Sequence, residues 1–302
     1  MTSPEQTADI LRSHSSSTVA HGQQWNVTLL APALDWAPNT CEGFSVNPDK
    51  HAQILRDIQI MRGQVYREYE PIAAELLSDG RHYDPLDEKS WHIVLHTPAG
   101  YILGSSRYRV IENGFEDLGV SRSALASSPE YGPLLKTAVE RHIQQAISSG
   151  VQYGEAGMWA LRPEARCSTA AVTIALAAFA LAKALGGGLG ITTATTRHGS
   201  SAILQRLGGS TFTELPSYYE PKYGCTIEVV HFDSANLHPR YQARMRRVEE
   251  ELASCDRIGA KSCREDSPAG DPSSQATADL LALGRRLAAS TSSAPRYSQT
   301  LT

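Results

Sequence analysis

One segment constrains the fold of this chain more than any other. Residues 153–169, YGEAGMWALRPEARCST, run directly into an apolar stretch, residues 170–182. The first part has the residue types of a strand, an Arg-Pro turn follows, and a Ser-Thr pair precedes residues that suit a helix. Strand, turn and helix in succession are typical of a mixed α/β domain. The helix is apolar almost all round, which predicts that other elements cover most of it.

The start of this helix offers a place for an anion. The first turn leaves backbone N–H groups unpaired, and the helix dipole places about half a positive charge there. Ser168 or Thr169 is suited to cap the helix, and two arginines lie just upstream. These features predict a phosphate-binding group made of Arg162, Arg166, Cys167, Ser168 and Thr169. The residues alone leave an alternative open, an ordinary cap with two solvated arginines.

Composition and spacing exclude several classes. With a net charge of −4, the chain lacks the basic excess that binds nucleic-acid phosphates. The N-terminus lacks the features of a secretory signal, and the longest apolar run is shorter than the ~20 residues that cross a membrane. We therefore expect no transmembrane segment and a cytoplasmic location. The five cysteines lack CxxC spacing and the ten histidines lack paired ligand spacing, so we expect no metal site.

The two ends of the chain differ in composition from its middle. Residues 1–22 are polar, and residues 253–302 are dominated by Ser, Thr, Ala, Pro and charged residues. Neither stretch offers enough apolar area to offset the entropy cost of ordering. We predict one domain over residues 23–252 between two disordered tails. Leucines at near-helical spacing predict one short helix in the second tail, over residues 277–289.

Within the predicted domain, hydrophobic spacing indicates alternating helices and strands. The helices are expected over residues 51–69, 132–149, 168–185 and 200–207, and the strands over residues 91–97, 101–111, 152–161, 189–195 and 225–232.

Several motifs follow one another in a distinctive order. Arg62 and Tyr66 stand four residues apart on the first predicted helix, an Asp-x-x-Asp loop occupies residues 84–87, and Arg107 follows a glycine on a strand. Glu155 lies on the strand before the apolar helix. This order resembles the acyl-homoserine-lactone synthases and the long-chain N-acyl amino acid synthases, which have the GNAT (Gcn5-related N-acetyltransferase) fold. The resemblance covers about residues 50–235 and implies an α/β, GNAT-like fold, a mixed central sheet flanked by helices.

Other positions favour one branch of this group. Residues 216–228 and 231–234 resemble the N-acyl amino acid synthases in particular. His82 and Met158 occupy positions where the lactone synthases usually carry an acidic residue and an arginine. The resemblance therefore implies an amine acceptor other than the one that lactone synthases use.

The resemblance also implies roles for individual residues. Glu155 would be the general base, acting directly or through one water, and the backbone N–H groups of Trp159, Ala160 and Leu161 would bind the thioester oxygen. The predicted substrate-binding residues are Arg62, Tyr66, His82, Asp84, Asp87 and Arg107. In this set Asp84, Asp87 and Arg107 would form a charged frame, and Arg107 could also clamp an acceptor carboxylate.

Two further hypotheses concern the acyl group itself. Cys167, a thiol at a helix start, is a competing candidate for a covalent acyl acceptor. The acyl chain would need an apolar tunnel, for which Leu176, Phe179 and Ala180 are candidates, although such residues at helical spacing also suit a plain core.

The implied activity is that of an N-acyltransferase, an enzyme that moves a fatty acyl group from acyl carrier protein, or from acyl-CoA, to the amine of an amino acid or similar small metabolite. The acyl-phosphopantetheine or acyl-CoA is then a co-substrate, and no permanently bound cofactor is expected. Arg56, Arg62 and Arg67 on the first helix would suit an acidic carrier protein. Two alternatives stay open: acylation of a peptide or protein side-chain amine, and a non-catalytic module that binds acyl carriers or acyl ligands.

Overall fold

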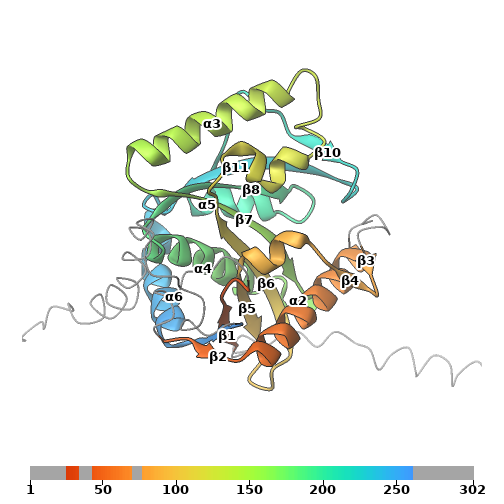
Figure 1. Cartoon of the computed structure of the whole chain (residues 1–302), viewed down its shortest axis with the longest axis vertical. Coiled ribbons are helices and arrows are strands. Elements are labelled where there is room, and N and C mark those ends of the chain that lie inside the picture. Colours follow the sequence, from red (N-terminus) through yellow and green to blue (C-terminus); the bar gives the residue numbers. More distant parts are fainter. Residues whose placement is uncertain (1–24, 34–42, 70–76, 261–302) are drawn as a thin grey trace, which may run out of the picture.

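A ten-stranded mixed sheet forms the centre of the molecule in the computed structural model, which describes residues 25–33, 43–69 and 77–260 (Figure 1). Nine strands follow the order β10-β11-β8-β7-β6-β5-β1-β12-β2, and β9 pairs with β11. The strands are β1 (Asn26–Leu30), β2 (Ser45–Val46), β5 (Trp91–His96), β6 (Ile102–Val110), β7 (Gln152–Leu161), β8 (Gly188–Thr195), β9 (Ser210–Thr211), β10 (Tyr218–Glu220), β11 (Cys225–Asp233) and β12 (Asp256–Gly259). A two-stranded sheet, β3 (Leu77–Ser78) with β4 (Arg81–His82), lies outside it.

The direction of the strands changes at the middle of the sheet. From β1 through β5 and β6 to β7, neighbouring strands are antiparallel, whereas β7 and β8 are parallel. Parallel neighbours need a long crossover connection, and helix α4 (Ala170–Ala184) supplies it. The strand–turn–helix segment that dominates the sequence therefore builds the parallel pair at the centre of the sheet.

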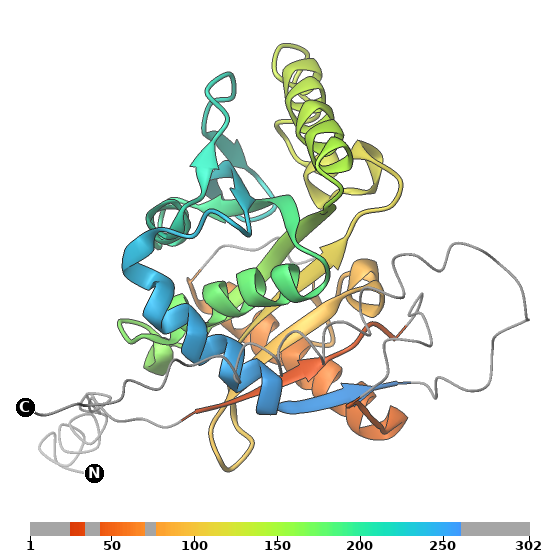
Figure 2. The ribbon, with the colours of Figure 1, turned by 90° about the vertical axis from the view of Figure 1, so that its left-hand side faces the viewer.

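Helices cover both faces of the sheet. On one side, here called the α4 face, α4 packs with α5 (Ser200–Leu207) and α6 (Gln242–Ser254) in the largest hydrophobic cluster. The opposite side, the α2/α3 face, carries α2 (Pro48–Tyr69) and α3 (Gly132–Ser148) over two smaller clusters. Figure 2 shows α4 and α6 against one face of the sheet, with α2 behind the strands.

The expected elements are present with small shifts at their ends, and the predicted fold class is confirmed. Every residue of 173–182 in α4 is buried, as its all-round apolar sequence indicated. Side chains of Ile58, Met61 and Val65 form the buried stripe of α2. The spacing of apolar residues predicted both helices, α2 and α4, because each packs against the sheet along its full length.

Hydrophobic spacing did not predict several elements, among them β1, α6 and β12. The last of these, Asp256–Gly259, lies beyond the predicted boundary at residue 252 and joins the sheet as a parallel neighbour of β1. Only two of its four residues are buried, so its place depends on pairing rather than on a local hydrophobic pattern. The helix predicted over residues 277–289 and the tail 1–22 lie outside the described residues.

Candidate active site

The two parallel central strands separate partway along their length. Their registered pairs run from Gln152 with Gly188 to Glu155 with Ile191, although β7 continues to Leu161 and β8 to Thr195. Close approach before the separation requires glycine, because a Cβ at Gly190 would lie 2.4 Å from the carbonyl oxygen of Gly154. Beyond Glu155 the strands diverge and leave an opening through the sheet.

A β-bulge marks the diverging part of β7. Two residue steps on β6, from Ser105 to Arg107, face three on β7, from Gly157 to Ala160. Within this stretch Met158 has φ +51°, a left-handed conformation that is rare for residues other than glycine. Bulges and strained backbone of this kind concentrate at functional sites, where they redirect side chains and terminate pairing.

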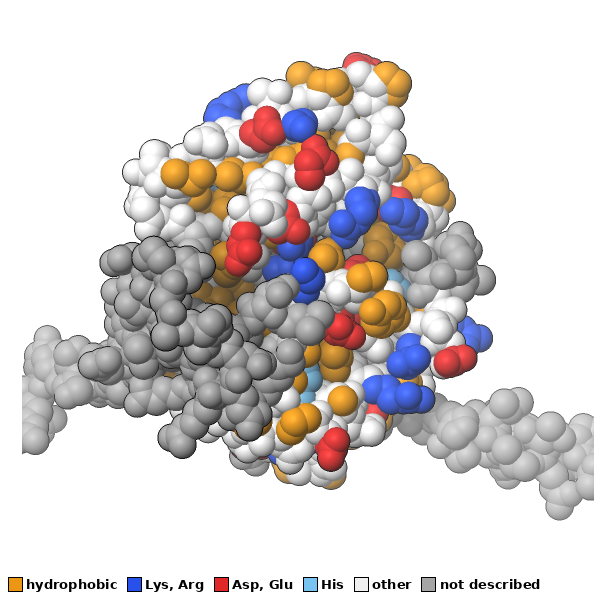
Figure 3. Space-filling view, in the orientation of Figure 1, with side chains coloured by type: hydrophobic (Ala, Val, Ile, Leu, Met, Phe, Trp, Pro, Cys, Tyr) orange, Lys and Arg blue, Asp and Glu red, His pale blue; other side chains and the backbone are white. Residues whose placement is uncertain are grey.

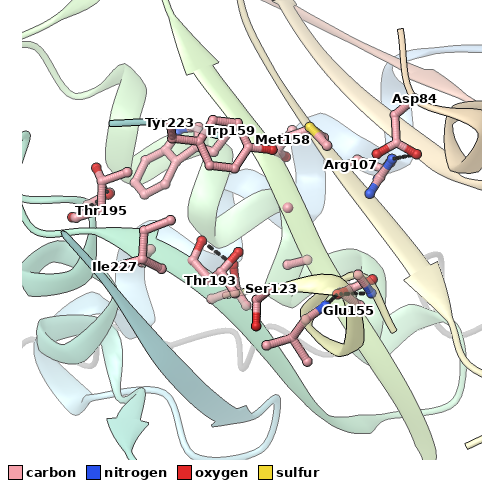
Figure 4. A pocket seen from close by; sticks show the side chains of 18 of the residues that line it. Asp84, Arg107, Ser123, Glu155, Met158, Trp159, Thr193, Thr195, Tyr223 and Ile227 are labelled. Atoms are coloured by element: carbon pink, nitrogen blue, oxygen red, sulfur yellow. Dashed lines mark hydrogen bonds and ion pairs between the residues drawn. The ribbon is translucent and has the colours of Figure 1, made fainter. Parts of the chain in front are cut away.

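A cavity of about 600 Å³ occupies the opening and has walls from both faces of the sheet. This volume is in the range of small-molecule sites in proteins. Figure 4 shows labelled side chains from several strands around it, with Trp159 and Tyr223 on one side, Glu155 near Ser123, and Asp84 paired with Arg107.

The end of the cavity at the α4 face is mainly apolar. Its wall combines residues of α4, α5 and the neighbouring strand β11: Ile174, Ala175, Ala178, Phe179, Leu204 and Phe232. Of the three residues predicted to line an acyl tunnel, Phe179 lines the cavity, whereas Leu176 and Ala180 belong to the buried core. An alkyl chain placed here would remain out of water.

The end at the α2/α3 face carries a charged frame. Arg107 on β6 contacts Asp84 at 3.2 Å and Asp87 at 3.4 Å. Both aspartates belong to the turn around η3 (Pro85–Lys89), which Asp84 caps. Arg62 approaches Asp87 from α2, and its Nη1 donates to Asp87 Oδ1 at 2.9 Å. In Figure 3, Lys, Arg, Asp and Glu side chains gather between α3 and α2, whose positions are those of Figure 1.

The members of this frame differ in access to the cavity. Asp84, Arg107, His82 and Tyr66 line it. Arg62 is fully buried, does not line the cavity and donates to the carbonyl oxygen of His82 at 2.9 Å. The sequence placed Arg62 on a surface for a carrier protein and among the substrate contacts. The structure corrects both expectations, because Arg62 lies on the inner side of α2, where it pairs with Asp87, itself behind the cavity wall.

His82 is an uncharged group in this wall. It is 2% exposed, and its ring meets that of Tyr66 edge to face with centroids 5.1 Å apart. Burial, together with the nearby charge of Arg62, lowers the pKa of His82 to about 4. At neutral pH the imidazole is therefore available as a hydrogen-bonding group without a charge.

Glu155 lines the cavity from β7, and its carboxylate has partners on both oxygens. Oε1 accepts hydrogen bonds from the backbone N–H of Gly119 at 2.8 Å and of Val120 at 3.3 Å. Oε2 lies 3.5 Å from Arg109 Nη2 on β6. Since each carboxylate oxygen has two lone pairs, Oε2 can accept another hydrogen bond from the cavity. Glu155 also anchors η5 (Gly119–Arg122) to the sheet.

The residues predicted to bind the thioester oxygen divide into two sets. Trp159 lines the cavity, while Ala160 and Leu161 do not. Ala160 packs with the α2 cluster and Leu161 with the α4 cluster. Their backbone nevertheless belongs to the diverging part of β7, immediately after the bulge.

The five residues predicted to bind phosphate do not line the cavity. Arg162 Nε donates to the carbonyl oxygen of Ile102 at 2.8 Å, and its guanidinium lies over the Tyr101 ring, 4.6 Å from the centroid. Arg162 therefore points along the edge of β6 rather than toward the start of α4. Ser168 Oγ does accept from the backbone N–H of Ala170 at 3.1 Å.

The remaining members of this group add no cavity contact. Thr169 makes no side-chain capping bond. Arg166 Nε donates to the Leu161 carbonyl oxygen at 3.2 Å. Cys167 is an exposed thiol with φ +56°. Its position outside the cavity gives the covalent acyl-acceptor hypothesis no geometric support.

Sequence reasoning missed a second polar wall of the cavity. It consists of Gly119, Val120, Arg122 and Ser123 from the η5 turn, and of Tyr218, Glu220, Lys222 and Tyr223 from β10 and the hairpin that follows. The only sequence signal was the unusual tyrosine-rich run at residues 216–228, which carried no assigned role. These two segments are about 100 residues apart, so only the fold brings them together.

Three polar atoms of the cavity wall have no hydrogen-bond partner among the described residues. They are His82 Nδ1, Ser106 Oγ and Trp159 Nε1, and all three are buried. Buried polar atoms are normally paired with protein or water. The wall therefore offers donors and acceptors to a molecule inside the cavity.

Two searches of the described part of the chain bear on other classes of site. In residues 25–33, 43–69 and 77–260, no cluster of three or more His, Cys, Asp or Glu side chains has the arrangement of a metal site. No helix within those ranges combines the length and hydrophobicity needed to span a membrane.

Comparison with known proteins gives matches in structure only. No protein-family model and no curated protein sequence matches this chain. The solved structures that it resembles include the AHL synthase LasI (13% identity, 70% of this chain and 91% of LasI covered, TM-score 0.43). A second match is BjaI, a CoA-dependent acyl-homoserine lactone synthase with SAM and isopentyl-CoA (10% identity, 85% of this chain and 99% of BjaI covered, TM-score 0.47). A third is FeeM, an N-acyl amino acid synthase from uncultured soil microbes (11% identity, 63% of this chain and 88% of FeeM covered, TM-score 0.39). These structures include an acyl-homoserine-lactone synthase and an N-acyl amino acid synthase.

Proposed function

We propose that this chain is an N-acyltransferase that moves a fatty acyl group from acyl carrier protein or acyl-CoA to the amine of an amino acid or similar small metabolite. The observation that carries the proposal is the separation of β7 and β8 beyond Glu155 and Ile191, which opens a cavity through the sheet. A donor thioester and an acceptor amine can enter such an opening from opposite faces and meet between the strands.

The chemical character of the two ends supports this division. Apolar residues at the α4 face suit an alkyl chain, whose burial is favourable by about 0.8 kcal/mol per methylene. Charged and hydroxyl groups at the α2/α3 face suit a small polar acceptor. The backbone freed by the bulge in β7 lies between the two ends, where a thioester carbonyl would be polarised by N–H donors.

The reaction requires one bond to form and one to break. The uncharged amine nitrogen of the acceptor attacks the thioester carbon, the carbon–sulfur bond breaks, and the sulfur leaves as a thiolate. In this proposal Glu155 Oε2 takes the proton that the amine loses, directly or through one water. Burial raises the pKa of Tyr223 to about 12, so its hydroxyl stays protonated and can donate a hydrogen bond to the leaving thiolate, which takes its proton from water.

Acyl carrier protein and acyl-CoA present the same thioester to the cavity. Arg56 and Arg67 are exposed on α2 and would attract an acidic carrier protein. The donor is therefore tested in both forms.

The test is a transfer assay on the purified full-length chain. Dodecanoyl and hexadecanoyl thioesters, on acyl carrier protein and on CoA, are incubated with a pool of the twenty amino acids, and products are identified by mass spectrometry. We expect N-acyl amino acids, and we expect Glu155→Gln to lower the rate by about 100-fold or more. Glu130→Gln, at an exposed carboxylate outside the cavity, is the matched control.

Each other outcome rejects part of the proposal. Products formed only with a peptide pool would replace the small acceptor with a peptide or protein amine. Thiol release that Glu155→Gln leaves unchanged would remove Glu155 as the base. The absence of thiol release from every donor with every acceptor, in a chain whose circular dichroism shows the folded state, would overturn the transferase proposal and favour an acyl-binding module.

A further inference from the structure

We infer that Arg122, assisted by Lys222, binds the carboxylate of the acceptor, and that the enzyme therefore acts on amines that carry an acidic group. This inference deepens the proposed function and rests on it. Arg122 and Lys222 both line the cavity and are exposed at its α2/α3 end. They belong to two segments of the chain that meet only in the folded protein.

The balance of charges in the cavity singles out Arg122. Asp84 contacts Arg107, and Glu155 is held by two backbone N–H groups and Arg109. Glu220 accepts from the backbone N–H of Ala124 at 2.9 Å and of Lys222 at 3.4 Å. Each of these three carboxylates, which are those of the described residues that line the cavity, thus has a partner within the protein.

The cations of the cavity do not all have such partners. Arg107 is balanced by two aspartates. The guanidinium of Arg122, by contrast, has no carboxylate partner among the residues that the structure describes, and the Lys222 ammonium donates only to the Arg122 carbonyl oxygen, at 2.9 Å. The cavity therefore presents an unbalanced positive charge at this point, which an anionic group of a ligand would neutralise.

The turn that carries Arg122 is fixed at both ends by buried carboxylates. Glu155 holds its start through Gly119 and Val120, and Glu220 holds its end through Ala124. Both glutamates are less than a tenth exposed. A side chain on a preorganised turn loses less entropy on binding than one on a free loop, so Arg122 is presented to the cavity by a built site.

The position of Arg122 relative to Glu155 matches an acceptor that has an amine and a carboxylate close together. The backbone N–H of Gly119 contacts Glu155. Arg122 follows three residues later in the same 3₁₀ turn, and because each residue of such a turn rises about 2 Å, the backbone of Arg122 lies about 6 Å along the turn axis from that of Gly119. One small molecule can therefore touch both groups, with its amine toward Glu155 and its carboxylate toward Arg122. Arg107 was the sequence-based choice for this clamp, but its charge is already neutralised by the frame.

The test measures binding, so that it is separate from the transfer assay. N-lauroylglycine and its amide, N-lauroylglycinamide, have the same acyl chain and differ only in the carboxylate. We expect the unaltered protein to bind N-lauroylglycine at least about 10-fold more tightly in isothermal titration, because the amide cannot accept the charge-assisted hydrogen bonds that a carboxylate accepts from arginine. Arg122→Gln removes this preference, Lys222→Met reduces it, and Arg122→Lys retains part of it.

The matched control is Arg206→Gln, at an exposed arginine of α5 outside the cavity, which keeps the full preference. Equal binding of the two ligands by the unaltered protein, or binding of neither, overturns the inference. So does an Arg122→Gln variant that keeps the preference but binds free coenzyme A more weakly, because the cations would then serve the phosphates of the donor. In each of these cases, N-acyl amino acids formed in the transfer assay would leave the proposed function standing.

Discussion

Arg62 and Asp87 form an ion pair in which neither side chain is accessible to solvent. The pair joins α2 to the η3 turn, and Gln59 Nε2 adds a hydrogen bond to Asp87 Oδ2 at 3.2 Å. Burial alone would raise the pKa of Asp87, but the Arg62 guanidinium outweighs burial and holds that pKa well below its usual range. The pair therefore supports the wall of the cavity from behind without touching its contents.

The first prediction concerns this pair. Arg62→Leu leaves the Asp87 carboxylate buried and unpaired, and we expect the free energy of unfolding to fall by about 3–5 kcal/mol. Urea unfolding followed by circular dichroism gives the value. The double variant Arg62→Leu/Asp87→Leu, which removes both charges, should lose less than the single variant. A single variant within about 1 kcal/mol of the unaltered protein would contradict the structural role of the pair.

The second prediction concerns stability and pH. Burial lowers the pKa of His82, His92 and His142 to about 4, from the ordinary value of 6.5. Between these values the unfolded chain binds more protons than the folded one, so stability is full above about pH 6.5 and falls as the pH drops toward 4. The Arg62–Asp87 ion pair adds to the loss of stability in acid only below about pH 4, which is the pKa of an aspartate in the unfolded chain.

Melting temperatures measured between pH 4 and 8 check this expectation. His92 is 1% exposed, and its Nε2 donates a hydrogen bond to the carbonyl oxygen of Asp87 at 2.8 Å. His92→Gln should flatten the pH dependence between pH 4 and 6.5, even if it lowers stability at every pH. His238→Gln, at an exposed histidine, should leave the slope as it is. A melting temperature that is constant over this interval would reject the prediction.

The third prediction concerns the place where β7 and β8 begin to separate. A Cβ at Gly154 would lie 2.3 Å from the Tyr108 hydroxyl oxygen, whereas a Cβ at Gly157, three residues along the same strand, meets no atom within 4 Å. Gly154→Ala should therefore destabilise the protein by about 1–3 kcal/mol through overpacking, and Gly157→Ala should not. Equal unfolding midpoints for the two variants in urea would show that the Tyr108 side chain moves aside at little cost.

The fourth prediction concerns the length of the acyl chain. Ala178 lines the apolar end of the cavity and is buried, so Ala178→Phe should shorten the space for a chain. We expect transfer of hexadecanoyl groups to fall by about tenfold relative to shorter chains, since single methylenes are worth about 1–3 kcal/mol in a fitted pocket. Ala171→Phe, on the same helix but outside the cavity, is the control. An unchanged chain-length profile, measured by competition between thioesters, would place the acyl chain elsewhere.

Much of the fold and part of the site followed from the sequence. Hydrophobic period predicted the helices over residues 51–69 and 168–185 because each packs a long continuous face. The order of the motifs indicated that Tyr66, Asp84, Arg107 and Glu155 belong together, and the structure places all four on one cavity. Their separation along the chain is large, so the resemblance to known enzymes, rather than any local pattern, carried that expectation.

The sequence by itself determined the long helices α2, α3 and α4 and the strands β5 to β8, because hydrophobic spacing, caps and turn residues act over a few neighbours. Only the tertiary structure decided which charged side chains are free. Arg62 and Arg107 are neutralised by the η3 aspartates, Arg162 is turned toward Tyr101, and Arg122 is left without a described carboxylate partner at the cavity. Each of these outcomes depends on the meeting of segments 20 to about 100 residues apart, and on burial that a local pattern does not encode.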